Sequence, residues 1–184
     1  ERLLARARYV APATAPYQPK PAGPDEHLHF AYCFGTQVAI VEVDERTGEV
    51  EVLQVIAAHD AGRVINPQAA EGQVEGGVMM GLGYALTEEF VLQGGQVVTN
   101  DLRKLGVPTI ARLPQVTAIL IENLHPQGPL GAKGMAELPA AATAPAIINA
   151  IYDAVGVRIR RLPATPARVL RALQERRAGA AGQG

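Results

Sequence analysis

The sequence predicts an α+β domain built on a mixed sheet, and three features of the chain support this class. Residues 29–43 and 49–57 alternate apolar with polar positions around the turn-forming segment 44–48, a pattern typical of a β-hairpin. Residues 68–89 predict a long helix that contains several glycines, and residues 166–177 predict a C-terminal helix.

The N-terminal residues differ in composition from the rest of the chain. Residues 1–26 are rich in proline and alanine, which predicts an extended arm or connector after a short helical segment at residues 2–8. The folded domain is expected to span residues 27–177, and residues 178–184 are expected to form a flexible tail. The single cysteine, Cys33, lies in an apolar stretch and is expected to be a buried, unreactive thiol.

The long helix has an unusual composition. Asn66 and Pro67 end a loop, and Pro67 suits the first position of the helix that follows. The helix contains glycine at positions 72, 76, 77, 81 and 83. Each glycine costs a helix about 0.5–1 kcal/mol relative to alanine, so we expect a close contact with a sheet or a ligand to explain them.

The second half of the chain predicts shorter elements. In chain order they are a turn at 94–95, strands at 96–99 and 116–122, a helix at 144–154 and a short strand at 157–160. Thr143 is a candidate N-cap for the helix, and Gly156 a candidate C-terminal stop. Isoleucines at helical spacing in this segment predict a core-facing stripe.

Composition excludes several classes of protein. The chain has 184 residues, 48% of them apolar and 19% charged, with a net charge of −1, values typical of a soluble globular domain. This charge gives no basic footprint for nucleic acid. We find no secretory signal in residues 1–26 and expect no apolar run of membrane-spanning length. One cysteine excludes an internal disulfide framework and an iron–sulfur cluster held by this chain alone. Because the chain does not begin with Met, we expect it to be a fragment, a processed piece or one segment of a longer polypeptide.

The most informative segment is the loop 131–139, which places a single carboxylate, Glu137, among apolar neighbours. A carboxylate that loses hydration becomes a better proton acceptor at neutral pH, as a general base requires. Gly131 and Gly134 allow the backbone to approach a ligand closely. A surface loop that happens to carry a glutamate is the alternative interpretation.

Other polar groups have simpler explanations. His27 and His29 could ligate a metal, but no cluster of further ligands accompanies them in the sequence. His59 and Asp60 end a strand and are expected to have a structural hydrogen-bonding role. The segment 128–133 is not a nucleotide phosphate loop, because Gly134 stands where Ser or Thr should follow the lysine.

Gln73 lies in the glycine-rich helix between small and apolar residues. If its amide is buried, both its acceptor and its donors need partners. It would then either bind a neighbouring loop or donate to a ligand. The glutamates at 71 and 75 are interpreted as surface or loop-anchoring charges.

Several motifs occur together in a fixed order. They are 59–67 (His-Asp-Ala-Gly-Arg-Val-Ile-Asn-Pro), the glycine-rich segment 71–83, 85–89, 128–134, Glu137, 144–147, 149–153 and 163–166. In this combination the chain resembles the C-terminal molybdenum-cofactor-binding region of the large subunit of the xanthine dehydrogenase and aldehyde oxidase family. The resemblance extends from about residue 30 to about residue 170. It implies that the fold is the second half of a molybdopterin-binding domain.

The resemblance implies an oxidoreductase that hydroxylates an N-heterocycle or an aldehyde with oxygen derived from water. The cofactor would be a molybdenum–pterin, either molybdopterin or its cytosine dinucleotide form. The metal would be held through the pterin dithiolene, with no direct protein ligand. Glu137 would be the general base and Gln73 a donor to the cofactor. The remaining predicted cofactor contacts are Gly131, Ala132, Lys133 and Gly134.

The resemblance also implies missing parts. The first cofactor-binding segment and the iron–sulfur and FAD modules are not in this chain, so we expect a cytoplasmic hetero-oligomer that acts on a small molecule. Neither nucleic acid nor a membrane is an expected partner. Two departures from the family pattern, Ala136 where Gly is usual and Leu138 after the glutamate, affect the backbone of the loop.

Two other functions remain open. A non-catalytic scaffold would keep the fold without a cofactor, although it would have no need for both Gln73 and Glu137. A hydrolase that uses Glu137 with His59 lacks a nucleophile motif.

Overall fold

The structure is a computed structural model of the chain, and it describes residues 4–14 and 29–181. Its centre is a three-stranded sheet in the order β1–β2–β5. Strands β1 (Gly35–Val43) and β2 (Val50–Asp60) form an antiparallel hairpin, and β5 (Gln115–Ile121) runs parallel to β2. The expected hairpin and mixed sheet are therefore confirmed, although β1 begins six residues after the predicted start at residue 29.

Helix α1 (Pro67–Leu86) lies in the connection between the parallel strands β2 and β5. Parallel strands need a long crossover connection, and a helix is the usual solution. The Asn66 side chain accepts a hydrogen bond from the backbone N–H of Ala69, and Pro67 occupies the first turn as predicted. The helix ends at Leu86, three residues before the predicted end.

Helix α3 (Leu138–Val155) is longer than predicted and begins six residues earlier. Glu137 occupies the N-cap position and Pro139 lies in the first turn. The predicted N-cap, Thr143, is wrong, because this residue lies inside the helix and is fully buried. The sequence was misleading because Pro145 also suits a first turn, yet here it is accommodated within the helix. Gly156 ends the helix in the left-handed conformation, as predicted.

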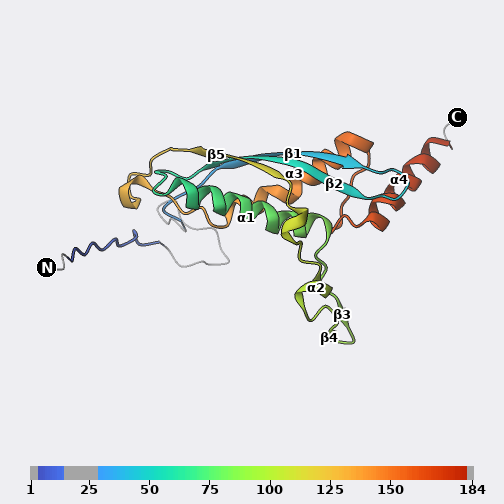
Figure 1. The fold of residues 1–184 in the computed structure, drawn as a ribbon, viewed down its shortest axis with the longest axis horizontal. Helices are drawn as coiled ribbons and strands as arrows, with labels where there is room; N and C mark the ends of the chain where they lie inside the picture. The colour runs from blue at the N-terminus through green and yellow to red at the C-terminus, as the bar shows by residue number, and fades with distance from the viewer. Residues whose placement is uncertain (1–3, 15–28, 182–184) are drawn as a thin grey trace.

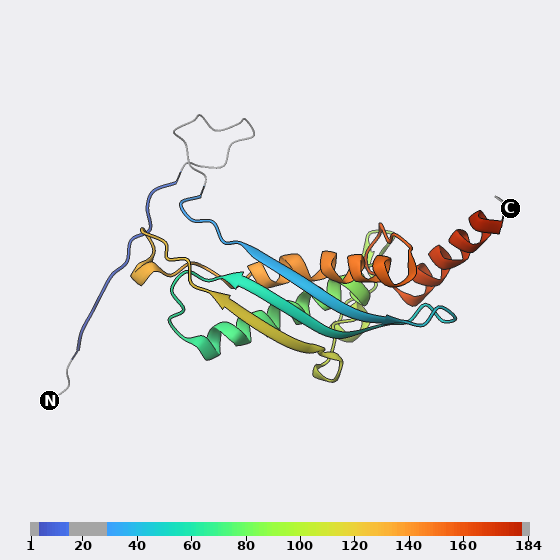
Figure 2. The same ribbon diagram turned by 90° about the horizontal axis from the view of Figure 1, so that it is seen from above.

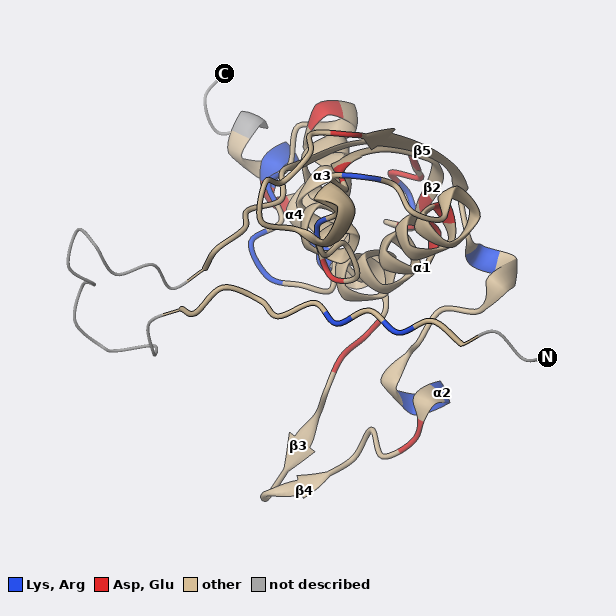
Figure 3. Ribbon diagram, turned by 90° about the vertical axis from the view of Figure 1, so that its left-hand side faces the viewer, with Lys and Arg blue, Asp and Glu red and all other residues tan. Residues whose placement is uncertain are grey.

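Both helices cover the same face of the sheet, which gives two layers (Figures 1 and 3). Inward-facing residues of β2, among them Val55 and Ala57, pack against Val74 and Val78 of α1 and Ile147 and Ile151 of α3. These six side chains are completely buried. Helix α4 (Pro166–Ala181) closes one end of this core through Val169 and Leu173 and continues past residue 177, where the tail was predicted to begin. Figure 2 shows the sheet from above, with α4 alongside the hairpin turn and its C-terminal end reaching past it.

The segment that connects α1 to β5 projects from the body of the domain (Figure 1). It contains β3 (Leu92–Gln93), β4 (Gln96–Val97) and α2 (Leu102–Leu105), followed by a 3-10 turn at Ile110–Arg112. Only the strand near residue 96 was predicted. A second 3-10 turn, Pro129–Gly131, follows β5.

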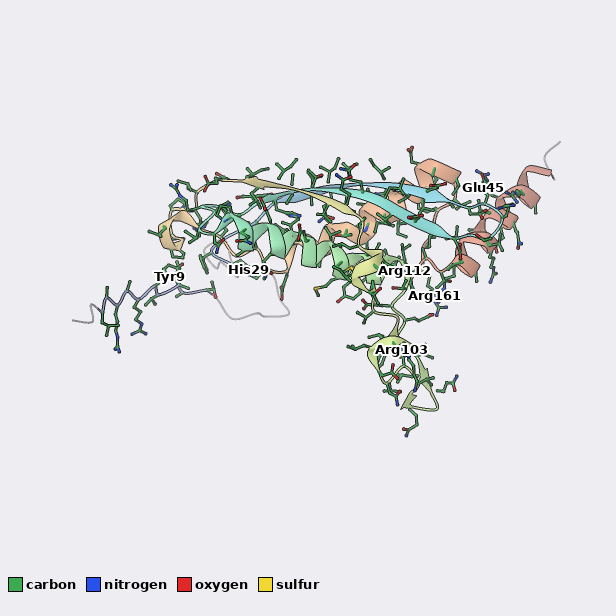
Figure 4. All side chains as sticks on the ribbon, in the orientation of Figure 1. Tyr9, His29, Glu45, Arg103, Arg112 and Arg161 are labelled. Carbon is green, nitrogen blue, oxygen red and sulfur yellow. The ribbon has the colours of Figure 1, made fainter. Side chains whose placement is uncertain are left out.

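Two predicted elements are absent from the described residues. Residues 157–160 form no strand, and residues 4–8 of the predicted N-terminal helix are not helical. Residues 4–14 instead run outside the body, where the Tyr9 hydroxyl donates to the Gln127 carbonyl over 2.8 Å (Figure 4). The rest of the predicted arm, and His27, lie outside the described residues.

The outer face of the sheet carries exposed apolar side chains. Val38 and Ile40 on β1 and Ile119 and Ile121 on β5 are each about half exposed, at 57%, 45%, 46% and 48%. A large exposed apolar patch usually marks an interface. This finding agrees with the expectation that the chain is one part of a larger assembly.

One helix corrects an expectation about membranes. By length and hydropathy α3 is long and apolar enough to cross a membrane, although the sequence was expected to contain no such run. Here it packs against β1 and α1, and its isoleucines form the centre of the core. We therefore interpret α3 as the core helix of the domain.

Candidate functional site

The predicted site residues lie at one end of the paired helices α1 and α3. The two helices run in the same direction, and glycines of α1 contact the first turns of α3. A Cβ on Gly77 would lie 2.4 Å from Pro139 Cβ, and a Cβ on Gly81 would lie 2.4 Å from Thr143 Cβ. Gln73 is one helical turn before this contact, and Glu137 immediately precedes α3. The fold thus brings two residues that are 64 positions apart to the same end of the helix pair.

Four of the five glycines of α1 fall into two classes. Gly77 and Gly81 permit the close approach of a helix, α3, where the sequence led us to expect a sheet or a ligand. Around Gly72 and Gly76, by contrast, an added Cβ would meet no atom within 4 Å. The open face next to Gln73 is consequently available to a ligand or to another protein segment.

The loop 131–134 is attached to the end of β2 by backbone hydrogen bonds. The Gly131 carbonyl accepts from the N–H groups of Arg63 (2.9 Å) and His125 (3.0 Å). The Lys133 N–H donates to the Ala61 carbonyl over 3.0 Å, and Ala132 forms a bridge with Gly62. These contacts give the loop a defined shape beside α3.

Cys33 borders the same loop. Its thiol donates to the Gly134 carbonyl over 3.0 Å and is partly exposed, so the prediction of a fully buried thiol is wrong. Burial nevertheless raises the pKa of Cys33, while the nearby Lys133 ammonium opposes that shift. The result agrees with the expected low reactivity.

Glu137 itself is exposed, and so are Gly134 and Ala136. The desolvation expected from its apolar neighbours is not supplied by the described part of this chain, because Met135 and Leu138 are themselves only partly buried. The side chain of Glu137 forms no capping hydrogen bond to α3. The carboxylate is therefore open to whatever covers this end of the molecule.

Gln73 is exposed as well, so its amide does not face the burial that we considered from the sequence. In this position its donors can reach a ligand that lies over the open part of α1. Gln73, Gly134 and Glu137 are thus each exposed near the end of the helix pair at which α3 begins.

A buried polar network was not predicted from the sequence. The Gln37 amide donates to the Pro139 carbonyl (2.7 Å) and lies 3.1 Å from His59 Nε2. The Thr143 hydroxyl lies 2.6 Å from Gln37 Oε1 and 2.9 Å from the Pro139 carbonyl. The network joins both strands of the hairpin to the first turn of α3. Position 37 is one of the alternating positions of β1 that face the core, and a glutamine there was the signal that could have indicated this network.

His59 is fully buried under Gly35, where a Cβ would lie 2.5 Å from His59 Nδ1. Burial lowers the pKa of His59. Among the described residues its Nδ1 has no hydrogen-bond partner. The predicted structural role of His59 agrees with this position, which is unsuited to a base for the hydrolase alternative.

The surface hollows lie at both ends of the domain. A shallow hollow near the loop is lined by residues that include Phe34, Asp60 and Asn123. A larger groove lies near the hairpin turn, between Glu49, Leu86 and Arg112, and contains none of the predicted site residues. Within residues 4–14 and 29–181, no group of three or more His, Cys, Asp or Glu residues could hold a metal ion. The exposed groups of the predicted site are the Gln73 amide and the Glu137 carboxylate.

Comparisons with known proteins agree with this geometry. Residues 2–114 match the family model of the molybdopterin cofactor-binding domain. The xanthine dehydrogenase molybdenum-binding subunit of Escherichia coli is 38% identical over 138 residues, which cover 74% of this chain and 18% of the relative. Aldehyde oxidoreductase of Megalodesulfovibrio gigas is 39% identical over 150 residues, covering 78% of this chain and 16% of the relative.

Solved structures give the same result. The aldehyde oxidoreductase from Desulfovibrio gigas superposes with a TM-score of 0.74 at 36% identity, covering 82% of this chain and 17% of that protein. Quinoline 2-oxidoreductase from Pseudomonas putida 86 superposes with a TM-score of 0.70 at 35% identity, covering 74% of this chain and 18% of that protein. The chain therefore spans about a sixth of the length of these relatives.

Proposed function

Because the chain belongs to the family of molybdopterin cofactor-binding domains, we propose that it forms one side of the active site of a molybdenum hydroxylase. The relatives are oxidoreductases, and the group that the family binds is the molybdenum–pterin cofactor. One observation supports the proposal most: the contact of Gly77 with Pro139 brings Gln73 and Glu137, both exposed, to the same end of the α1–α3 pair.

The chemistry at this end of the pair fits the cofactor. Gly72 and Gly76 leave space for a flat group against α1, and Gln73 offers amide donors beside that space. The first turn of α3 adds the partial positive charge of a helix N-terminus, which favours anionic groups. A metal that is held through the pterin needs no histidine or carboxylate cluster from the protein.

Each residue then has a defined task. Gln73 donates a hydrogen bond to the bound group, and the backbone of the loop 131–134 supports it. When bound, the molybdenum–pterin group accepts the two electrons that leave the substrate. Glu137 accepts the proton of the attacking water-derived oxygen, and the carbon of an N-heterocycle or aldehyde is hydroxylated.

The exposure of Glu137 indicates what the rest of the protein must contribute. A base that is open to bulk water gains little proton affinity, so a further segment has to cover this end of the domain. We propose that the first cofactor-binding segment does so, in a cytoplasmic assembly that also contains iron–sulfur and FAD modules. The exposed outer face of the sheet supports such an assembly.

The test is Glu137→Gln in the assembled enzyme. The amide conserves the shape but cannot accept the proton, so the reductive half-reaction should slow by about 10²–10⁴-fold with unchanged molybdenum content. Glu75→Gln is a matched control, because Glu75 is exposed on α1, and it should turn over normally. Turnover by Glu137→Gln at the wild-type rate, with full metal occupancy, would rule out this role.

Gln73 is tested separately. Gln73→Ala removes one hydrogen bond to a charged group, a loss of about 1.5–3 kcal/mol, and should reduce the molybdenum retained after gel filtration. Unchanged retention together with unchanged kinetics would mean that Gln73 does not contact the cofactor. The scaffold alternative is not favoured by the relatives, and absence of molybdenum from the purified native assembly would revive it.

A further inference from the structure

The loop 131–134 contains a lysine whose charge does not face solvent. Lys133 Nζ lies 2.6 Å from Asp60 Oδ2, and the two side chains are only 5% and 6% exposed. The other carboxylate oxygen of Asp60, Oδ1, accepts a hydrogen bond from the Gly62 N–H over 3.0 Å. The ammonium is therefore neutralised within the fold, at the point where β2 ends.

The surroundings of this ion pair are closely fitted. Gly62 has a φ of +62°, and a Cβ there would lie 2.4 Å from the Gly131 carbonyl oxygen and 2.9 Å from the Lys133 nitrogen. Burial alone would raise the pKa of Asp60, but the hydrogen bonds from Lys133 and from the Gly62 N–H hold it below its ordinary value. Asp60 is thus a buried carboxylate whose ionised form is stabilised by its lysine partner together with the Gly62 N–H.

We propose that the Asp60–Lys133 pair is a clasp that holds the loop 131–134 in its binding shape, and that the Lys133 ammonium does not contact the cofactor. This inference rests on the proposed function for the identity of the bound group. It makes Asp60 and Lys133 positioning residues that act through the loop. The conventional alternative is that the lysine presents its positive charge to an anionic cofactor.

The two roles predict opposite results in a double variant. Lys133→Met leaves an unpaired carboxylate in the interior, whereas Asp60→Asn/Lys133→Met removes both charges and keeps the approximate side-chain volumes. If the pair is a clasp, Lys133→Met should reduce cofactor retention about tenfold or more, and the double variant should recover most of it. If the ammonium binds the cofactor, both variants should lose it equally.

The experiment uses the purified assembly, with pterin and molybdenum measured per chain after gel filtration. Hydrogen exchange of the Arg63 and Lys133 amides provides a second measurement, because both amides bond across the clasp. Exchange should accelerate at both amides in Lys133→Met and return toward wild type in the double variant. Lys104→Met is the matched control: Lys104 pairs with Asp101 on the surface, with side chains 56% and 51% exposed, and should change neither measurement.

Each outcome decides the question. If Lys133→Met does not fold, the cofactor content of the folded double variant still distinguishes the two roles. Normal content in the double variant supports the clasp, and an empty site overturns it. Equal loss of cofactor in a folded single and a folded double variant also overturns it. If the wild-type assembly contains no molybdenum–pterin group, the proposed function fails, whereas unchanged amide exchange in Lys133→Met would refute the clasp by itself.

Discussion

The two classes of glycine in α1 lead to substitutions with opposite effects on stability. In Gly77→Ala the new methyl group would lie 2.4 Å from Pro139 Cβ and 3.0 Å from the Ala140 nitrogen. Because the second of these atoms is backbone, α3 would have to move. Overpacking costs about 1–3 kcal/mol, and a contact this short belongs near the upper limit. Since alanine favours the helix by about 1 kcal/mol over glycine, the net loss should be roughly 2 kcal/mol.

Gly76→Ala is the matched control, because its methyl group would meet no atom within 4 Å. Only the helix propensity then changes, and the chain should gain about 0.5–1 kcal/mol. In a chain of this size 1 kcal/mol corresponds to roughly 2–4 °C in Tm. Far-UV circular dichroism during heating should thus show Gly77→Ala melting ~4–8 °C lower and Gly76→Ala melting ~1–4 °C higher. A Gly77→Ala variant as stable as wild type would refute the close packing of α1 on α3.

The remaining stability predictions concern the buried network. Thr143→Val keeps the shape but leaves Gln37 Oε1 without its donor, so denaturant unfolding should show a loss of about 1–3 kcal/mol, whereas the exposed Thr109→Val should have no effect. Burial lowers the pKa of His59 below its ordinary value of 6.5, so the unfolded chain binds the proton first as pH falls. The free energy of unfolding should therefore decrease as the pH falls below about 6.5. His59→Asn should weaken this pH dependence, whereas the exposed His29→Asn should retain it. An unchanged pH dependence in His59→Asn would contradict the argument.

Local patterns identified the elements whose cause is local. Alternation around residues 44–48 predicted the hairpin, and Asn66 followed by Pro67 predicted the start of α1, because both signals act within a few residues. The start of α3 was missed because signals that act within a few residues do not decide it. Pro139 and Pro145 both suit a first turn, and only packing against α1 and β1 selects the earlier one.

The candidate site shows a similar division. The sequence identified Gln73, the loop 131–134 and Glu137 through a resemblance, and the fold brings Gln73 and Glu137 to the same end of the α1–α3 pair. It did not indicate the Asp60–Lys133 pair, whose members are 73 positions apart, or the network of Gln37, His59 and Thr143. Those contacts depend on which side chains meet between distant segments, and no short motif encodes that information.

The exposure of Gln73 and Glu137 has a physical reason in the architecture. The close glycines of α1, the buried network and the Asp60–Lys133 pair are formed without the side chains of Gln73 and Glu137. Both side chains are exposed, although a general base requires an environment with little water. The base that we propose at Glu137 therefore needs an enclosure that comes from a further segment covering this end of the domain.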